Sequence, residues 1–343
     1  MDAEHKSLKV MSWNINTGHD YHGDFAEQLD KKHLIQTLDR IVETMLSENP
    51  EVILLQEVDY DWVGTHHIDQ LEYLTTKAGF TYHAKGKHHC SIVPERLRRY
   101  IGDWNNIVWN RDTGTGILSR YPVKEVSAFT FGQDFSDCRP VSKCAQLLNE
   151  SKGYTKAILD VDGADVTVFS VHLLNDIVYR ITNHIKVPVR NITFMRKFHF
   201  AKLIEHVRQV DGKVVIGGDL NTIPPESDRN NFDDEDNADR RYGDPDDYRG
   251  DCSMHIIRHE RTLKTIPALA GEGSPDEIRK YWTYPAHNPS RTLDYIFVST
   301  ALELQDYKVI SKNQIKRLQD EGSVQGEYIP SDHLPVVATV AFP

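Results

Sequence analysis

The sequence predicts an α/β protein in which β-sheets are packed in layers with helices on the outside. Strand-like and helix-like segments alternate in the first part of the chain, whereas short strand-like segments dominate the later part. Polar groups follow four apolar strands and precede two others. Such groups can meet at one edge only if the sheets contain antiparallel neighbours. These polar strand ends span residues 14–333, so we expect a single domain over residues 1–343.

The first part of the chain contains two expected strands and two expected helices. Trp13-Asn14 closes the first strand, and Gln56-Glu57 closes the second. Apolar residues at 34, 38, 41, 42 and 45 have helical spacing, and Asn49-Pro50 ends that helix. Gly79 is a suitable stop for the other helix. In order, the elements are a strand at 8–12, a helix at 33–46, a strand at 52–55 and a helix at 68–78.

The later part contains four expected strands and one helix. His172 closes one strand, and Gly217-Gly218-Asp219-Leu220-Asn221 ends another. The polar groups of the last two strands come first: Asp294 opens one, and Asp332-His333 precedes the other. The helix has apolar residues at 198, 201, 203, 204 and 207 on one side. The elements are strands at 166–171, 214–216, 295–298 and 336–340, and a helix at 194–210.

The composition predicts a folded protein and limits its partners. Of the 343 residues 39% are hydrophobic, which is ample for a sizeable core. The formal charge of -11 opposes nonspecific binding to long duplex nucleic acid, although a small phosphorylated substrate remains compatible with it. Charge is uneven along the chain, because residues 85–111 are mostly basic and residues 226–250 mostly acidic. We expect the acidic segment to be a solvated surface excursion rather than a calcium loop, since EF-hand spacing is missing.

Neither a targeting segment nor a cysteine-based site is indicated. The first residues lack an apolar stretch after their charges, and no run of ~18 apolar residues occurs. We therefore expect a cytoplasmic protein without integral membrane association. The four cysteines show no CxxC spacing, which favours free thiols over a zinc site or disulfides.

Glu57 is the first candidate for chemistry. It follows four apolar residues, where a carboxylate is costly unless it is exposed or bound to a cation. Mg²⁺ prefers oxygen ligands and keeps several waters, so Glu57 with Asn14 and Asp332 would suffice. The structural alternative is a capped strand end.

Asp219 and Asn221 flank Leu220, so both point to one face if strand geometry persists. The aspartate could orient or deprotonate an attacking water, and the asparagine could donate to charge on phosphoryl oxygens. A plain turn is the alternative. His333 could act as a base or phosphate contact with Asp294 fixing its tautomer, and His172 could donate to the leaving oxygen or a nonbridging one.

The combination and order of these motifs resemble the endonuclease/exonuclease/phosphatase superfamily. Deoxyribonuclease I has the fold of this superfamily. The resemblance covers nearly the whole chain. It implies a four-layered α/β sandwich in which two mixed, mainly antiparallel sheets lie face to face. It also implies hydrolysis of phosphate esters with Mg²⁺, for which Mn²⁺ could substitute. It also implies metal binding at Asn14 and Glu57, phosphate contact at His172, and an Asp294–His333 pair. The matching motifs are Ser12-Trp13-Asn14, Leu55-Gln56-Glu57-Val58, Gly116 to Pro122, Ser170-Val171-His172-Leu173, Gly218-Asp219-Leu220-Asn221, Leu293-Asp294-Tyr295-Ile296 and Ser331-Asp332-His333.

Details of the motifs narrow the resemblance. The Ser-His-Leu type of motif at residues 170–173 resembles the deoxyribonuclease I and sphingomyelinase branches more than the abasic-site endonucleases. The Leu-Asp-Tyr-Ile motif at residues 293–296 replaces the Cys-Asp-Arg of the inositol-polyphosphate 5-phosphatases, which disfavours that branch. Thr115 to Ser119 lacks the Asn often found in the family. Residues 85–111 and 175–190 look like insertions. We hypothesise that they wall the substrate site, with Arg180, Lys186 and Arg190 meeting an anion, whereas solvated loops are the alternative.

We therefore predict a metal-dependent phosphoesterase, of phosphodiesterase or nuclease type, in which water attacks phosphorus in line. The substrate is expected to be a nucleic-acid end or a compact phosphorylated molecule, as a diester or a monoester. One alternative is a lipid headgroup hydrolase similar to sphingomyelinases or phosphoinositide phosphatases. The alternative from another class is a catalytically silent binding or scaffold protein. The sequence leaves the oligomeric state open.

Overall fold

The computed structural model describes residues 7–20, 30–89, 112–131, 152–174, 189–224, 254, 256, 263–320 and 329–343. Most of the three expected insertions and all four cysteines lie outside these residues. The expected insertion at 85–111 begins with the last five residues of a strand, and the one at 175–190 runs into the start of a helix. Within the described part of the chain, no helix is long and apolar enough to cross a membrane.

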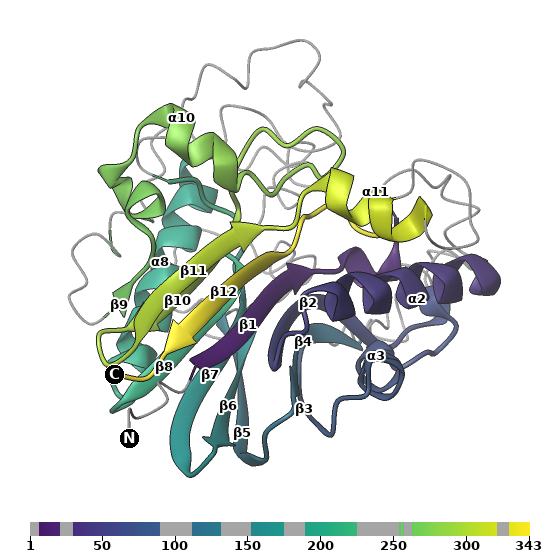
Figure 1. Cartoon of the computed structure of the whole chain (residues 1–343), viewed down its shortest axis with the longest axis horizontal. Coiled ribbons are helices and arrows are strands. Elements are labelled where there is room, and N and C mark those ends of the chain that lie inside the picture. The colour runs from purple at the N-terminus through teal and green to yellow at the C-terminus, as the bar shows by residue number, and fades with distance from the viewer. Residues whose placement is uncertain are drawn as a thin grey trace, which may run out of the picture.

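Two six-stranded sheets lie face to face at the centre of the molecule (Figure 1). Sheet A has the order β11 (Glu303–Val309), β12 (Val336–Ala341), β1 (Ser7–Asn14), β2 (Val52–Asp61), β4 (Asp112–Ser119) and β3 (Tyr82–His89). Sheet B has the order β5 (Val123–Thr130), β6 (Gly153–Val161), β7 (Ala164–His172), β8 (Lys213–Asp219), β10 (Asp294–Ser299) and β9 (Leu263–Lys264).

The two sheets share one pattern of strand directions. The β1–β2 pair of sheet A and the β7–β8 pair of sheet B are parallel, and the other described pairs are antiparallel. In both sheets the parallel pair is central, and its strands end at the edge where β10 and β12 begin. The prediction of mixed, mainly antiparallel sheets is therefore confirmed.

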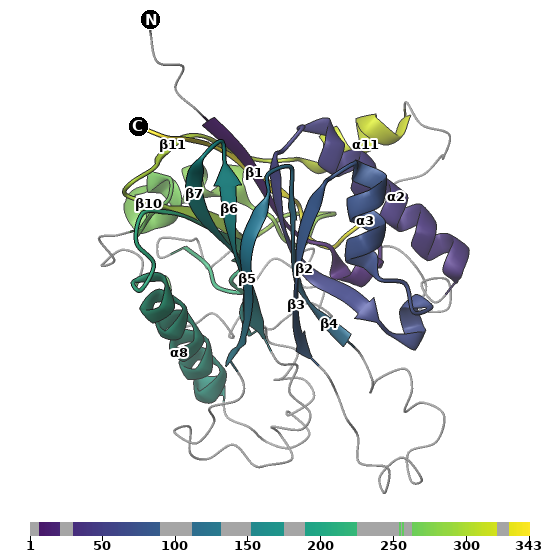
Figure 2. The same ribbon diagram turned by 90° about the horizontal axis from the view of Figure 1, so that it is seen from below.

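Helices cover the outer faces of both sheets (Figure 2). Against sheet A lie α2 (Lys31–Ser47), α3 (Gln70–Ala78) and α11 (Lys312–Asp320), and against sheet B lies α8 (Val189–Val207). Short helical segments, including α10 (Pro275–Ile278), connect β9 to β10. Asp30 and Asp69 cap α2 and α3, each accepting a hydrogen bond from a backbone N–H of the first turn. The four layers and the three expected helices are confirmed, with shifts of a few residues at their ends.

Alternation along the strands explains the layers. On β2, Val52 and Leu54 point into the core between the sheets, while Ile53 and Leu55 point to the helices. All four are fully buried. A strand covered on both faces reads as a continuous apolar run, so its polar residues gather at its ends. The fold thus brings the polar strand ends to one rim.

Candidate active site

The strand register aligns three candidate residues of sheet B. His172 ends β7 and pairs with Asp219, which ends β8. Asp219 pairs in turn with Asp294, the first residue of β10. Parallel and antiparallel pairing therefore set two carboxylates and an imidazole side by side on neighbouring strands. This geometry is the one expected from the reversed polar ends.

Asn14 joins this row to sheet A. Its Nδ2 donates to Asp219 Oδ2 at 3.0 Å and to Glu57 Oε1 at 3.2 Å. Its Oδ1 accepts a hydrogen bond from the backbone N–H of Asn16 at 3.0 Å. The side chain is 1% exposed, so the amide holds one carboxylate from each sheet in a fixed position.

Glu57 does not close its strand, as the sequence suggested, but lies within β2 at a β-bulge. Gln56 pairs with Thr115 and Val58 with Gly114, so Glu57 is the extra residue between them. Its φ of 53° is left-handed, which costs a non-glycine residue about 1–3 kcal/mol and typifies functional positions. The bulge explains the difference from prediction, because β2 continues to Asp61 after turning the Glu57 side chain to the rim. That side chain is 25% exposed, so it remains accessible.

Asp219 is a buried carboxyl that accepts hydrogen bonds from two donors. Oδ1 accepts from the Asn221 backbone N–H at 2.9 Å, and Oδ2 accepts from Asn14. Burial raises the pKa of Asp219 to about 7, with Asp294 adding to the rise while His333, Asn14 and Asn221 oppose it. Strand geometry ends here, since Asn221 has φ 49°, and its side chain donates to Leu173 O at 3.0 Å. An amide has two N–H groups, so this bond uses one of them.

His333 and Asp294 form the expected pair. Nδ1 of His333 lies 2.8 Å from Asp294 Oδ2, and Nε2 lies 3.7 Å from Asp219 Oδ2. Burial alone lowers the pKa of His333, but attraction to Asp294, Asp219 and Asp332 outweighs it and raises the pKa to about 10. The imidazole is therefore held in its charged form.

Three hydrogen bonds fix the loop that carries His333. Trp13 Nε1 donates to His333 O at 2.9 Å, and the His333 N–H donates to Ser331 Oγ at 3.2 Å. Ser331 Oγ donates to Asn14 O at 2.7 Å. The ring of Tyr284 lies against the imidazole at 4.7 Å between centroids. The loop before β12 is thus tied to the end of β1.

His172 lies between carboxylates and a lysine. Its Nε2 is 3.6 Å from Glu57 Oε1 and 3.5 Å from Asp219 Oδ2, while Nδ1 is 3.5 Å from Lys152 Nζ. Burial, and then the charges of Lys152, His333 and His88, lower the pKa of His172 well below its ordinary value. The sequence reading missed Lys152, which precedes the strand paired with β7.

Two groups of side chains could bind a cation. The first is the set expected from the sequence, in which Asn14 donates to Glu57 at 3.2 Å. Its third member, Asp332, has a pKa that burial raises to about 6, with His333 opposing the rise and the charge of Glu57 adding to it. The second contains Asp219, Asp294 and His333, whose ligand atoms all lie within 4.8 Å of one another. A charged imidazole has no lone pair for a metal. The oxygen-only group, with Glu57 accessible from the rim, fits Mg²⁺ better.

The basic side chains proposed for the substrate wall lie outside the described part of the chain. Arg180 and Lys186 lie outside the described residues, and the side chain of Arg190 does too. In place of the family's Asn, β4 carries Thr115, which lies 2.6 Å from Thr155 and 2.7 Å from His88 through its hydroxyl. This segment is part of the interior beside the site.

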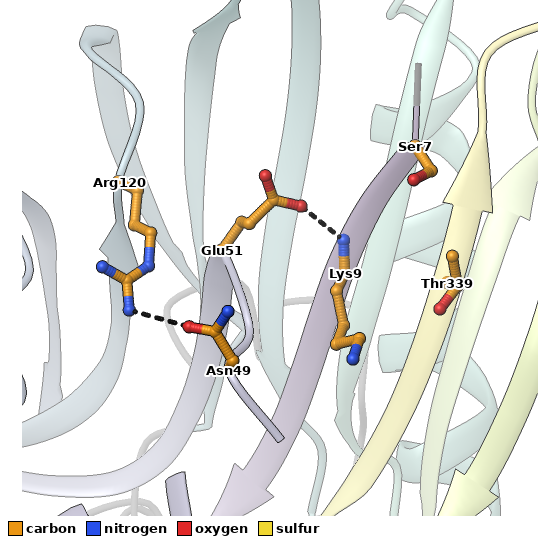
Figure 3. Close-up of a pocket in the computed structure, with 6 residues that line it drawn as sticks. All are labelled: Ser7, Lys9, Asn49, Glu51, Arg120 and Thr339. Carbon is orange, nitrogen blue, oxygen red and sulfur yellow. Dashed lines mark hydrogen bonds between the residues drawn. The ribbon is translucent and has the colours of Figure 1, made fainter. Parts of the chain in front are cut away.

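A separate hollow lies where β1 begins, at the far end of the strand from Asn14 (Figure 3). It has a volume of about 420 Å³. Its polar groups bind one another, since the Lys9 N–H donates to Glu51 at 2.9 Å and Arg120 donates to Asn49 at 3.3 Å. Seven residue steps along a strand span roughly 23 Å, so the hollow is not part of the rim. Its lining comprises Ser7, Lys9, Asn49, Glu51, Arg120 and Thr339.

Comparison with known proteins gives one family match and several matches in fold. The model of the Endonuclease/Exonuclease/phosphatase family matches residues 11–333. No curated protein is matched. At the low identities of the structural matches below, the likeness concerns the fold alone.

Three solved structures illustrate the likeness. An endonuclease/exonuclease/phosphatase from Beutenbergia cavernae has a TM-score of 0.58 at 18% identity, covering 98% of this chain and 72% of that one. D. rerio TDP2 complexed with a single-strand DNA product has a TM-score of 0.54 at 14% identity, covering 97% and 98%. The human Nocturnin catalytic domain with bound sulfate has a TM-score of 0.52 at 16% identity, covering 99% and 97%.

Proposed function

The chain belongs to the endonuclease/exonuclease/phosphatase family, whose members hydrolyse phosphoric esters, and we propose that it is a Mg²⁺-dependent phosphodiesterase. The proposed substrate is a single-stranded nucleic-acid end or a compact phosphodiester. One observation carries the proposal: Asn14 from sheet A binds the carboxylates of Glu57 and Asp219, which come from different sheets. The Asn14 amide thereby holds Glu57, the proposed metal ligand, close to Asp219, the proposed base.

Glu57 and Asp332 would hold the cation through their carboxylates, and Asn14 through Oδ1, which accepts one hydrogen bond from Asn16 and has a second lone pair. Their oxygens are the hard ligands that Mg²⁺ prefers, and Glu57 is accessible from the rim. When bound, the cation would neutralise charge on the phosphoryl oxygens and orient the ester. Asn14 then has a second role, because its amide keeps Asp219 at a fixed distance from this group.

Asp219 would orient and deprotonate the attacking water. A pKa of about 7 lets this carboxyl accept a proton near neutral pH, which is the range a general base needs. The charged His333 beside it would bind a phosphoryl oxygen, and Asp294 stabilises that charge. The second N–H of Asn221 and Nε2 of His172 would donate to the remaining oxygens as charge develops in the in-line transition state.

Charge and similarity support the choice of substrate. A formal charge of -11 opposes binding to long duplexes. TDP2, which has a similar fold, is found with a single-strand DNA product, and the Nocturnin domain binds a sulfate, an anion shaped like phosphate. We accordingly propose a substrate with few phosphates that can reach a rim between two sheets.

The test is hydrolysis of a substrate panel with Mg²⁺ or with EDTA. The panel contains single- and double-stranded DNA, RNA, a chromogenic phosphodiester, sphingomyelin and phosphoinositides. We expect metal-dependent cleavage of single-stranded ends or the small diester, abolished in Asp219→Ala. The matched control is Asp165→Ala, which removes an exposed carboxylate that pairs with Lys124 at the other end of β7. Preferred cleavage of a lipid would overturn the substrate assignment, and full activity of Asp219→Ala would overturn the mechanism.

A further inference from the structure

We infer that Lys152 is a positioning residue that fixes the tautomer of His172, so that the imidazole presents an N–H to the phosphoryl site. The inference rests on the proposed function and adds a residue to it. Lys152 lies immediately before β6, whose first residue, Gly153, pairs with His172. The register therefore places the lysine beside the imidazole.

Lys152 is built into the interior beside the site. The residue is 5% exposed, and its backbone carbonyl accepts a hydrogen bond from the Phe131 N–H at 2.8 Å. Its Nζ lies 3.5 Å from His172 Nδ1. A buried ammonium is costly without acceptors, and Nδ1 of His172 is one acceptor within its reach.

The chemistry of the two groups sets the tautomer. An ammonium has three donors and no acceptor, so the ring nitrogen that faces it must offer a lone pair. With Nδ1 as acceptor, the ring proton is on Nε2. That nitrogen faces Glu57 Oε1 at 3.6 Å and Asp219 Oδ2 at 3.5 Å, on the side where the phosphoryl group would lie. His172 thus serves as a neutral N–H donor.

The two histidines of the site have opposite partners. Nδ1 of His333 faces the carboxylate of Asp294 at 2.8 Å, which stabilises a charged ring. Nδ1 of His172 faces a lysine, which excludes a second ring proton. At Nδ1 the two rings therefore face opposite partners, a hydrogen-bond acceptor for His333 and a hydrogen-bond donor for His172.

The chain is closely packed at Gly153, the residue after Lys152. A Cβ at Gly153 would lie 2.1 Å from Phe129 O and 2.6 Å from His88 Nδ1, so only glycine lets these groups approach. His88 is held by Thr115, with 2.7 Å between Nε2 and the hydroxyl. Loss of the lysine would leave His172 free to move its proton to Nδ1. A lone pair would then face the phosphoryl oxygens.

The experiment compares Lys152→Met, which removes the donor, with Lys152→Arg, which keeps one. Lys156→Met is the matched control on the same strand, where Lys156 is half-buried and pairs with Phe169. We expect kcat on the chromogenic phosphodiester to fall about 10- to 100-fold in Lys152→Met, a typical effect of losing an outer partner. KM should change by less than about threefold, because the donation strengthens in the transition state. Lys152→Arg should restore most of kcat, and Lys156→Met should match the parent protein.

Nitrogen-15 NMR of the histidine rings supplies a readout that does not need turnover. We expect the parent protein to show Nε2 protonated and Nδ1 unprotonated at His172, assigned through His172→Gln. Lys152→Met should populate the other tautomer. A parent ring protonated on Nδ1 would overturn the inference, even if Lys152→Met failed to fold. Correct tautomers in a parent protein that cleaves no phosphodiester would instead count against the proposed function alone.

Discussion

Asp219 and Asp294 are direct cross-strand partners in the antiparallel β8–β10 pair, and His333 reaches both from the loop before β12. Two buried carboxyls would repel each other if both were charged. The positive imidazole between them reduces that cost. The pKa of His333 is therefore raised to about 10, while burial still raises the pKa of Asp219 to about 7.

Asp219→Asn should strongly lower kcat and stabilise the metal-free protein at pH 8. Removal of a general base costs roughly 10²- to 10⁴-fold in rate. The folded-state pKa of Asp219 is raised from 3.8 to about 7, so its favourable contribution, present at low pH, is lost as the pH rises through 7. The variant with a neutral amide should then have a free energy of unfolding about 1–3 kcal/mol higher than the parent protein at pH 8. Urea denaturation in EDTA measures this, and an unchanged or lower stability contradicts it.

Asp294→Asn should weaken both catalysis and the stability that depends on His333. The raised pKa of His333 contributes stability that is complete below 6.5 and lost as the pH rises through about 10. The stability deficit of the variant should therefore be largest near neutral pH and shrink toward pH 10. Melting temperatures across this range measure it. A deficit that is constant with pH would show that Asp294 acts through packing.

Glu57→Gln should raise the Mg²⁺ concentration needed for half-maximal activity by at least about tenfold. The amide keeps the side-chain size but removes the charge that attracts the cation. The matched control is Glu51→Gln, just before the opposite end of β2, where the carboxylate accepts from the Lys9 backbone N–H (Figure 3). It also accepts from the Tyr121 hydroxyl. Equal Mg²⁺ dependence in the two variants would remove Glu57 from the metal site.

Gly218→Ala should destabilise the fold by about 3 kcal/mol or more, because its Cβ would lie 1.9 Å from Val171 O on the neighbouring strand. Gly79→Ala is the comparison, since its left-handed φ of 68° meets open space. That change should cost only about 1–2 kcal/mol. Chemical denaturation of the two variants tests the order, and similar losses would mean that the strands can separate at Gly218.

The sequence was sufficient for the central strands and for most of the rim. Strands buried on both faces are continuous apolar runs, so the groups at their ends, such as Asn14, His172 and Asp219, could be read directly. The bulge at Glu57 could not, because its register depends on the partner strand β4. The outer strands β3, β5 and β11 are polar or exposed, and their periodicity is weak.

A hairpin turn in the sequence predicts that Lys152 lies close to His172. Asp162-Gly163 is a typical two-residue hairpin loop, and both residues have positive φ, at 52° and 87°. Such a loop pairs Val161 with Ala164 and, counting outward, Gly153 with His172. The hairpin signal therefore places Lys152 next to His172 and the rim from the sequence alone.

The hydrogen bond from Trp13 to His333 joins residues 320 positions apart, and β1 is paired with β12 along its length. During synthesis, residues 331–341 emerge long after β1, β2 and the hairpin of β6 and β7. A ribosome-bound chain that lacks them has neither His333 nor a partner for one side of β1. The Asp294–His333 pair and the antiparallel partner of β1 are thus completed only after residues 331–341 have been made.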